Sequence, residues 1–308
     1  KDLERHIKEY LAVRCGMQEI FSYPWMEESY VNAILQSTDG ILALSTPPSP
    51  LERFIRASLL PNLCRAVAKN ERYYGDFAIF ETAQVFRDEN YTAPYDEREK
   101  LPSQRKNVAG AFVSAGKDVT GLFRRAKGVV EMMPRYTHME PYSFRQVSKP
   151  VWADEVVWLN IYLGEEYIGD LALLSKRVSM ACGIKNVNVM LFQLDQDALI
   201  PLRSRTNSFR HLAEYPMTDY DISLLLDGQV KWADVAQTIG GIKNPLLHGA
   251  AFVDEYRGKQ VPEGKKSLTA RLTIGSAEKT LTSAEIEEVA NSVLKKLAKR
   301  FGAELRSR

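Results

Sequence analysis

The chain has 308 residues, of which 45% are hydrophobic and 26% charged, and its formal net charge is +2. This length is enough for about two domains with cores of their own, and the composition is that of an ordinary soluble globular protein. No apolar run approaches the roughly 18 residues of a membrane span, so we expect no contact with a membrane. The small net charge excludes a histone-like polycation but allows a local basic patch.

Cysteine and histidine usage argues against a disulfide framework and against a zinc site. The three cysteines are odd in number and far apart, and the four histidines form no i,i+4 pair. Residues 1–10 are charged and amphipathic, so no secretory signal is visible. We therefore expect a reducing, cytoplasmic location. The chain has no initiator Met, which suggests a piece of a longer protein.

The first two hundred residues mix helix and strand signals without strict alternation, which favours an α+β fold over a doubly wound sheet. Leu3, Ile7 and Leu11 lie four apart, as on one face of a helix. The patterns predict helices over 3–15, 51–70 and 118–133, the last with Asp118 as N-cap. They predict strands over 17–25 and 108–114, one strand or a strand pair over 77–90, and a pair over 157–174 joined at 164–166. Pro61 must then occupy a first turn or mark a break. The prolines in 45–50 force a loop, and the polar residues 91–107 predict an exposed loop.

From about residue 205 the order of predicted elements is βαββαβ, the ferredoxin-like arrangement. The helix over 282–302 carries the clearest signals: one apolar stripe from Ile286 to Phe301, a capping-box spacing of Thr282 and Glu285, and Gly302 just beyond the end. We expect domains over 1–203 and 204–308. From Arg205 onward the chain has 16 Lys and Arg against 13 Asp and Glu, an excess too small to prove a nucleic-acid partner.

The segment DEYRGKQVPEGKKSLTARLTI, residues 254–274, places a basic loop before a strand. It is not a phosphate-binding loop, because five residues separate Gly258 from Gly264 and a second lysine precedes the serine. Basic side chains beside an aromatic ring suit RNA, since charge attracts the backbone and rings stack on bases. The residues concerned are Tyr256, Arg257, Lys259, Lys265 and Lys266. The residues alone favour the alternative, a solvated hairpin whose lysines deter edge pairing.

Glu81 and Arg87 could form a substrate-gripping pair on adjacent strands, but a structural role is favoured, because no nucleophile, histidine base or metal cluster completes a site. We predict no catalytic residue and no metal site in this chain. Trp152, Trp158 and Trp232 are expected in a core or an interface.

Several motifs resemble one protein family in order and spacing. EYPMTDYDISLLLD, D-x-Y-R-G-x-x-x-P-x-G-K-K-S and the closing T-L-T…G-A-x-L-R are similar to the ferredoxin-fold anticodon-binding domain of the bacterial phenylalanyl-tRNA synthetase beta subunit. CGMQEIFSYPW, LERFIRASLLPNL and FAIFETAQVFR resemble the catalytic-like module that precedes that domain. The resemblance spans nearly all of the chain.

The resemblance implies a class II synthetase-like antiparallel-sheet module, without catalytic apparatus, followed by the βαββαβ domain. The first module would pack on the alpha subunit, and the second would bind the anticodon region of tRNA(Phe). The whole enzyme would be an ATP-dependent ligase that uses ATP and Mg²⁺, whereas this chain alone would be inactive and would hold no cofactor. We expect no DNA partner. The editing and early tRNA-binding modules of the family would lie upstream of Lys1.

The residues expected to contact tRNA are Tyr220, Tyr256, Arg257, Lys265, Lys266 and Arg306. The chain departs from the family pattern in two places. Asp219 and Tyr220 stand where the family has a basic pair, and LSKR, residues 174–177, replaces a His-Pro.

Two other functions remain open on the residues alone. The βαββαβ domain could sense an amino acid, as the same fold does in regulatory proteins, with Asp227 and Gly228 in the turn after its first strand. An acylphosphatase-like enzyme ranks last, because no Arg–Asn pair stands at suitable loop positions.

Overall fold

The computed structural model describes residues 2–92, 100–200, 215–258 and 260–306. It divides the chain into two compact units, Lys1–Asn207 (unit 1) and Ser208–Arg308 (unit 2). The domain boundary expected between residues 203 and 204 lies outside the described residues.

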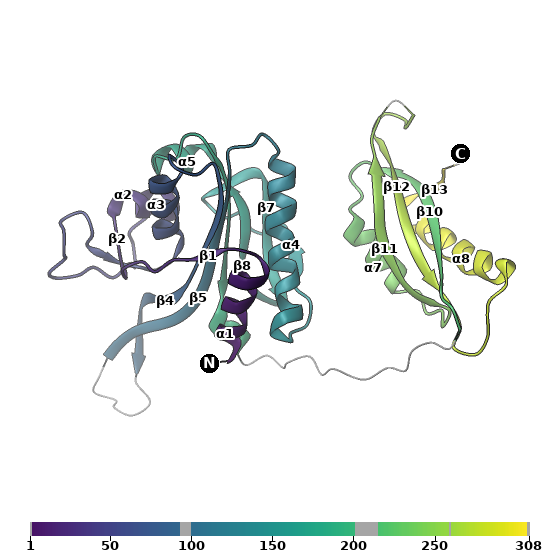
Figure 1. Cartoon of the computed structure of the whole chain (residues 1–308), viewed down its shortest axis with the longest axis horizontal. Coiled ribbons are helices and arrows are strands. Elements are labelled where there is room, and N and C mark those ends of the chain that lie inside the picture. The colour runs from purple at the N-terminus through teal and green to yellow at the C-terminus, as the bar shows by residue number, and fades with distance from the viewer. Residues whose placement is uncertain (1, 93–99, 201–214, 259, 307–308) are drawn as a thin grey trace. The chain divides into compact units, whose positions relative to one another are not determined.

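Unit 1 is built on a seven-stranded sheet (Figure 1). In sheet order its strands are β1 (Gln18–Glu19), β4 (Asp76–Thr92), β5 (Lys100–Ser114), β9 (Asn188–Asp195), β8 (Glu166–Leu174), β7 (Ala153–Leu163) and β6 (Ser143–Arg145). β1 runs parallel to β4, and the remaining pairings are antiparallel. The result is an α+β architecture with a mainly antiparallel sheet.

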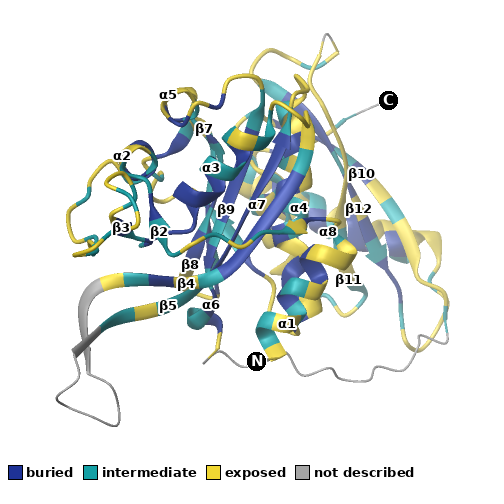
Figure 2. Ribbon diagram, turned by 60° about the vertical axis from the view of Figure 1, so that its left-hand side comes forward, coloured by how far each residue is buried: buried dark blue, intermediate teal, exposed yellow. Residues whose placement is uncertain are grey.

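Helices cover both faces of this sheet, because strands β4, β5, β8 and β9 are apolar on both sides. One face packs against α1 (Asp2–Glu9) and α4 (Val119–Thr137), and the other against α2 (Glu28–Leu35), α3 (Leu60–Asn70) and α5 (Lys176–Ala181). In Figure 2 the buried residues run along these central strands. Short elements complete the unit: η1 (Tyr10–Arg14), α6 (Gln196–Leu199) and the pair β2 (Trp25–Met26) and β3 (Phe54–Ile55).

β8 and β9 approach very closely at Gly169. A Cβ atom there would lie 2.0 Å from the carbonyl oxygen of Gln193, and the glycine has a φ of +155°. Only glycine satisfies both conditions.

Most predicted elements of unit 1 are confirmed, including the strand over 77–90 and Asp118 as the N-cap of α4, where its side chain accepts from Gly121 N at 2.7 Å. The helix expected over 51–70 is wrong in its first half. It begins at Leu60 with Pro61 in its first turn, and Phe54–Ile55 pairs with β2 instead. Strand pairing has overridden the helical spacing there.

The exposed loop expected over 91–107 is also wrong from Lys100 onward, where β5 begins. Pro102 pairs with Asn90 on β4, whereas pairing with β9 starts only at Asn107. At Pro102, β5 is therefore an edge strand, which is where a sheet tolerates proline.

Unit 2 is a four-stranded antiparallel sheet in the order β11-β12-β10-β13. Its elements in chain order are β10 (Thr218–Asp227), α7 (Trp232–Gly240), β11 (Leu247–Tyr256), β12 (Lys265–Ile274), α8 (Ser283–Phe301) and β13 (Glu304–Leu305). This is the expected βαββαβ fold. Both helices cover the same face, because even-numbered residues of β10 and β12 enter one core with them. The other face is open.

Helix α8 has the features that its sequence predicts. Ile286, Val289, Ala290, Val293 and Leu297 are buried, and Thr282 and Glu285 form a capping box. Gly302 ends the helix in the left-handed conformation. No helix in the described parts of the chain is long and apolar enough to cross a membrane.

Candidate nucleic-acid interface

The open face of unit 2 brings several of the expected tRNA-contacting residues together at one end, drawn uppermost in Figure 1. Tyr256 ends β11, and Lys265 begins β12 opposite Asp227 of β10. Arg306 follows β13, and its backbone N donates to Ser223 O at 2.9 Å. These positions lie on the strand face that points away from the helices.

Tyr256 and Arg306 form the centre of this surface. The Arg306 guanidinium lies 5.6 Å from the centre of the Tyr256 ring, and it donates to Gln260 Oε1 at 3.1 Å. Tyr256 is 40% exposed. An exposed ring beside a cation is an arrangement on which a base can stack next to its phosphate.

Arg257 is held by two contacts at the same end. Its Nε donates to Glu255 Oε1 at 2.8 Å, and a terminal nitrogen donates to Gly228 O at 2.8 Å. The guanidinium therefore joins the β11–β12 loop to the turn after β10. Lys265 lies 3.7 Å from a carboxylate oxygen of Glu304, so both cations are only partly compensated at a solvated surface.

Lys266 points to the helix side of the sheet. It is 3% exposed, and its Nζ donates to Glu255 Oε2 at 2.7 Å. Burial by itself would raise the pKa of Glu255, but the hydrogen bonds from Lys266 and Arg257 lower it below its usual value. In this conformation Lys266 neutralises Glu255 and is not available to a phosphate.

Tyr220 also lies apart from the others. It stands near the start of β10, on the helix side, and packs against the core of unit 2. Lys259 lies outside the described residues. The structure therefore gathers Tyr256, Arg257, Lys265 and Arg306 on one surface, and places Lys266 and Tyr220 elsewhere.

Two residues of unit 2, one on the open face and one in the β11–β12 loop, were not predicted. Arg271 pairs with Asp221 through two hydrogen bonds of 2.8 and 2.9 Å. Gln260 orients Arg306. Apolar and polar residues alternate in KSLTARLTI, which could have placed Arg271 on the face of β12 away from its buried residues. No local pattern indicates that Gln260 reaches Arg306.

In unit 1, Glu81 does not pair with Arg87, the partner considered for it from the sequence. Glu81 is 1% exposed and pairs instead with Arg56, whose terminal nitrogen is 3.2 Å from Glu81 Oε1. Arg87 lines a separate cavity of about 500 Å³, in which Arg105 pairs with Asp195 at 2.9 Å. The structural role favoured for Glu81 is therefore correct, with a different partner.

Among the described residues, no group of three or more His, Cys, Asp or Glu side chains could hold a metal ion. Cys15, Cys64 and Cys182 are free thiols.

Solved structures define the class of fold. The chain is similar to the structure of PylSc, a pyrrolysyl tRNA synthetase from Desulfitobacterium hafniense, with a TM-score of 0.52 and 14% identity over 69% of this chain and 73% of that chain. A second structure of pyrrolysyl-tRNA synthetase from the same organism gives a TM-score of 0.52 at 15% identity, over 65% and 67% of the two chains. The chain thus contains a synthetase-like fold.

Family models identify the chain more closely. Residues 1–196 match the model described as "Phenylalanyl tRNA synthetase beta chain CLM domain", and residues 213–306 match "Ferredoxin-fold anticodon binding domain". The chain belongs to the phenylalanyl-tRNA synthetase beta chain family.

Curated relatives agree with this membership. The chain is 27% identical to the phenylalanine–tRNA ligase beta subunit of Oceanobacillus iheyensis and 28% identical to that of Carboxydothermus hydrogenoformans. Each alignment covers 99% of this chain and 38% of the relative. The chain therefore spans less than half the length of these relatives.

Proposed function

We propose that this chain is a non-catalytic part of a phenylalanine–tRNA ligase beta subunit. Unit 1 packs on the alpha subunit, and unit 2 binds the anticodon region of tRNA(Phe). The observation that supports the tRNA role is the exposed Tyr256 beside Arg306, Arg257 and Lys265, on the open face of a domain that matches an anticodon-binding family. The assembled enzyme works in the cytoplasm and uses ATP and Mg²⁺. This chain alone binds neither ATP nor Mg²⁺, and DNA is not its partner.

The binding mode follows from the chemistry of this surface. Arg257, Lys265 and Arg306 attract phosphates, while the Tyr256 ring offers a stacking face to an unpaired base. Anticodon loops are single-stranded, so their bases are free to stack. The neighbouring carboxylates, Glu255 and Glu304, limit the net positive charge, so we expect affinity to depend on the ring as well as on charge.

A titration of the full chain with fluorescent tRNA(Phe) tests this function. Tyr256→Ala should weaken binding about 5- to 150-fold, which corresponds to the roughly 1–3 kcal/mol of one stacked base. Arg306→Gln should reduce the dependence of log Kd on log salt by about one unit if the guanidinium contacts one phosphate.

Phe252→Ala is the matched control. Phe252 is 46% exposed and lies on the same strand, but it packs against Trp232 on the helix side. This variant should bind tRNA as the original chain does. Equal loss in Tyr256→Ala and Phe252→Ala, or no binding of tRNA even at low salt, would exclude the proposed surface. Heat released with phenylalanine in place of tRNA would instead favour an amino-acid sensor.

A further inference from the structure

The cavity of about 500 Å³ in unit 1 lies on the sheet face that α2 and α3 cover. Most of this face is apolar, with Leu191 of β9 and Ala172 of β8 in its core. Because side chains alternate along a strand, Gln193 lies on the same face as Leu191, and Asp170 on the same face as Ala172. These two polar residues pair across the strands and line the cavity, as does Asn107 of β5. Polar side chains therefore interrupt the core where the cavity lies.

The side chain of Asn107 is buried without a partner for its oxygen. The residue is 6% exposed, and its Oδ1 accepts no hydrogen bond in the described part of the chain. A buried polar atom left unpaired is unfavourable, so such atoms are rare in folded proteins. Because Asn107 lines the cavity, a molecule inside it can supply the missing donor.

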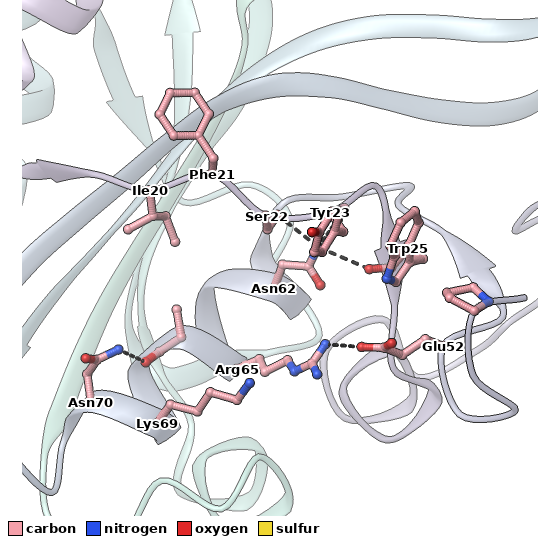
Figure 3. Close-up of a pocket in the computed structure, with 12 residues that line it drawn as sticks. Ile20, Phe21, Ser22, Tyr23, Trp25, Glu52, Asn62, Arg65, Lys69 and Asn70 are labelled. Carbon is pink, nitrogen blue, oxygen red and sulfur yellow. Dashed lines mark hydrogen bonds and ion pairs between the residues drawn. The ribbon is translucent and has the colours of Figure 1, made fainter.

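The groove between α3 and the segment that joins β1 to β2 provides a comparison (Figure 3). Asn62 there is also 6% exposed, but its Nδ2 donates to Ser22 Oγ and to Tyr23 O, both at 3.0 Å. Arg65 pairs with Glu52 in the same groove. These polar groups are satisfied within the chain, unlike the oxygen in the cavity over the sheet.

Asp170 is a partly buried carboxylate that has only neutral hydrogen-bond donors. Its Oδ1 accepts from Asn160 Nδ2 and its Oδ2 from the Tyr167 hydroxyl, both at 2.7 Å. The orientation of the Asn160 amide is fixed, since its Oδ1 accepts from the backbone N of Val147 and of Ser148. Burial raises the pKa of Asp170, and the two hydrogen bonds oppose this change only in part. A carboxylate in such surroundings is stabilised by a cation placed beside it.

Gln193 offers the cavity a hydrogen-bond donor. Its Oε1 accepts from Ser58 Oγ and from the backbone N of Leu59, both at 2.9 Å. A backbone N can only donate, so this contact identifies which end of the amide is the oxygen. The Nε2 of Gln193 has no acceptor among the residues that the structure describes, and it is available to a carbonyl oxygen.

The charges around the cavity favour a cationic molecule. The charged side chains that line it, among the described residues, are Arg87, Arg105, Glu166, Asp170 and Asp195, and their formal sum is −1. Arg105 is already paired with Asp195 at 2.9 Å. A molecule with a net positive charge therefore complements the cavity better than a zwitterion or an anion does.

These contacts define the chemical class of the molecule. A protonated primary amine has three donors and a positive charge, which match the Asp170 carboxylate and Asn107 Oδ1. An uncharged carbonyl group matches Gln193 Nε2. Leu35 and Leu60 also line the cavity, so a small apolar group completes the fit.

We propose that this cavity is a binding site for a small cationic amine that carries an uncharged carbonyl group and an apolar side chain, as an amino amide does. Asp170 and Asn107 hold the amine, and Gln193 holds the carbonyl oxygen. All three residues belong to unit 1, so the site is separate from the tRNA surface of unit 2.

Calorimetry of the full chain with L-leucinamide tests the proposal. L-leucinamide should bind with a Kd below about 10 mM, as a molecule of this size does at the affinity per atom that is usual for small ligands. Isocaproamide, the same molecule without its amine, should bind at least about tenfold more weakly, because it lacks the charged hydrogen bonds to Asp170. L-leucine should also bind more weakly, since its carboxylate removes the net positive charge.

Variants locate the binding in the cavity. Asp170→Asn should weaken the binding of L-leucinamide by about tenfold or more, and Asn107→Leu by about 2- to 10-fold. Asn107→Leu should not lower Tm, because it removes a buried acceptor that has no partner. Ala57→Phe fills the cavity without changing its polar groups and should abolish binding.

Glu165→Gln is the matched control for Asp170→Asn. Glu165 belongs to the same unit, its side chain is 87% exposed, and it does not line the cavity. This variant should bind L-leucinamide as the original chain does. Thermal unfolding of each variant shows whether it is folded, and if Asp170→Asn is not, Ala57→Phe tests the location instead.

Three results would overturn the proposal. The first is the absence of saturable heat when L-leucinamide is added to the folded original chain. The second is binding of isocaproamide or L-leucine as tight as that of L-leucinamide, which would show that the positive charge is not recognised. The third is unchanged binding in folded Ala57→Phe, which would place the molecule outside the cavity.

Discussion

Replacing Glu81 by alanine should destabilise unit 1 by about 3–5 kcal/mol, because removing one partner of a buried ion pair leaves the other charge buried without compensation. Glu81 accepts hydrogen bonds from Ser22 N, from Ser22 Oγ and from Arg56. The alanine variant loses all of them and leaves a buried cation. Burial already lowers the pKa of Arg56, and the attraction of Glu81 opposes that change.

For Glu81→Ala the structure indicates a loss of stability in the lower part of this range, near 3 kcal/mol. Arg56 keeps a hydrogen bond of 2.6 Å from its Nε to Gln84 O when Glu81 is removed, so its guanidinium is not left wholly unsatisfied. A unit of this size loses about 2–4 °C in Tm per kcal/mol. At a cost of about 3 kcal/mol we therefore expect Tm to fall by roughly 6–12 °C. Glu81→Gln retains an oxygen for Ser22 and should lose less than Glu81→Ala.

Tryptophan fluorescence during urea unfolding can report on unit 1 alone. Trp25, Trp152 and Trp158 lie in unit 1, and the fourth tryptophan, Trp232, lies in unit 2. In a Trp232→Phe background the signal therefore follows unit 1. A change in midpoint with an unchanged slope would identify a loss of stability and not of cooperativity.

A double-mutant cycle separates the interaction energy between Arg56 and Glu81 from the contribution that each side chain makes to stability by itself. Arg56→Met/Glu81→Leu should be less destabilised than the sum of the two single variants, since the double variant buries no unpaired charge. Glu165→Ala is the control, because Glu165 pairs with Arg145 at the surface, where its side chain is 87% exposed, and its loss should not change the unfolding midpoint. A cost below about 1 kcal/mol for Glu81→Ala, or strict additivity in the cycle, would refute the reasoning.

Two further predictions concern unit 2. Leu297 is a fully buried residue of α8, so Leu297→Ala should destabilise this unit by about 2–5 kcal/mol. Circular dichroism should show this loss of stability, and the fluorescence transition of unit 1 should not move. The Lys279 side chain, with Thr282 N and Oγ1, lowers the pKa of Glu285 to about 2. A lowered pKa in the folded state stabilises the fold above the unfolded pKa, and this stability is lost as pH falls from about 5 toward 2. The NMR titration of the Glu285 carboxyl should have its midpoint near 2, and Glu285→Gln should reduce the acid sensitivity of unit 2; a midpoint above 4 would contradict the capping box.

The candidate tRNA surface was predictable only in part. Tyr256, Arg257 and Lys265 are neighbours along one hairpin, so their shared location follows from the local pattern. Lys266 was expected beside them, yet strand alternation turns it to the helix side, where Glu255 holds it. Tyr220 was expected there as well, although it packs against the core near the start of β10.

Local patterns by themselves determined the elements whose signals are short-range. Three features follow directly from the sequence: the apolar stripe and caps of α8, the N-cap of α4, and the βαββαβ order of unit 2. Each depends on residues three to four apart or on turns. The tertiary structure alone decided the partner of Glu81 and the strand at 54–55. Arg56 lies 25 residues from Glu81 along the chain, and β3 forms because β2 and residues 42–44 lie beside it. No local spacing encodes such pairings, because their free energy comes from groups that meet only after the sheet and helices have packed.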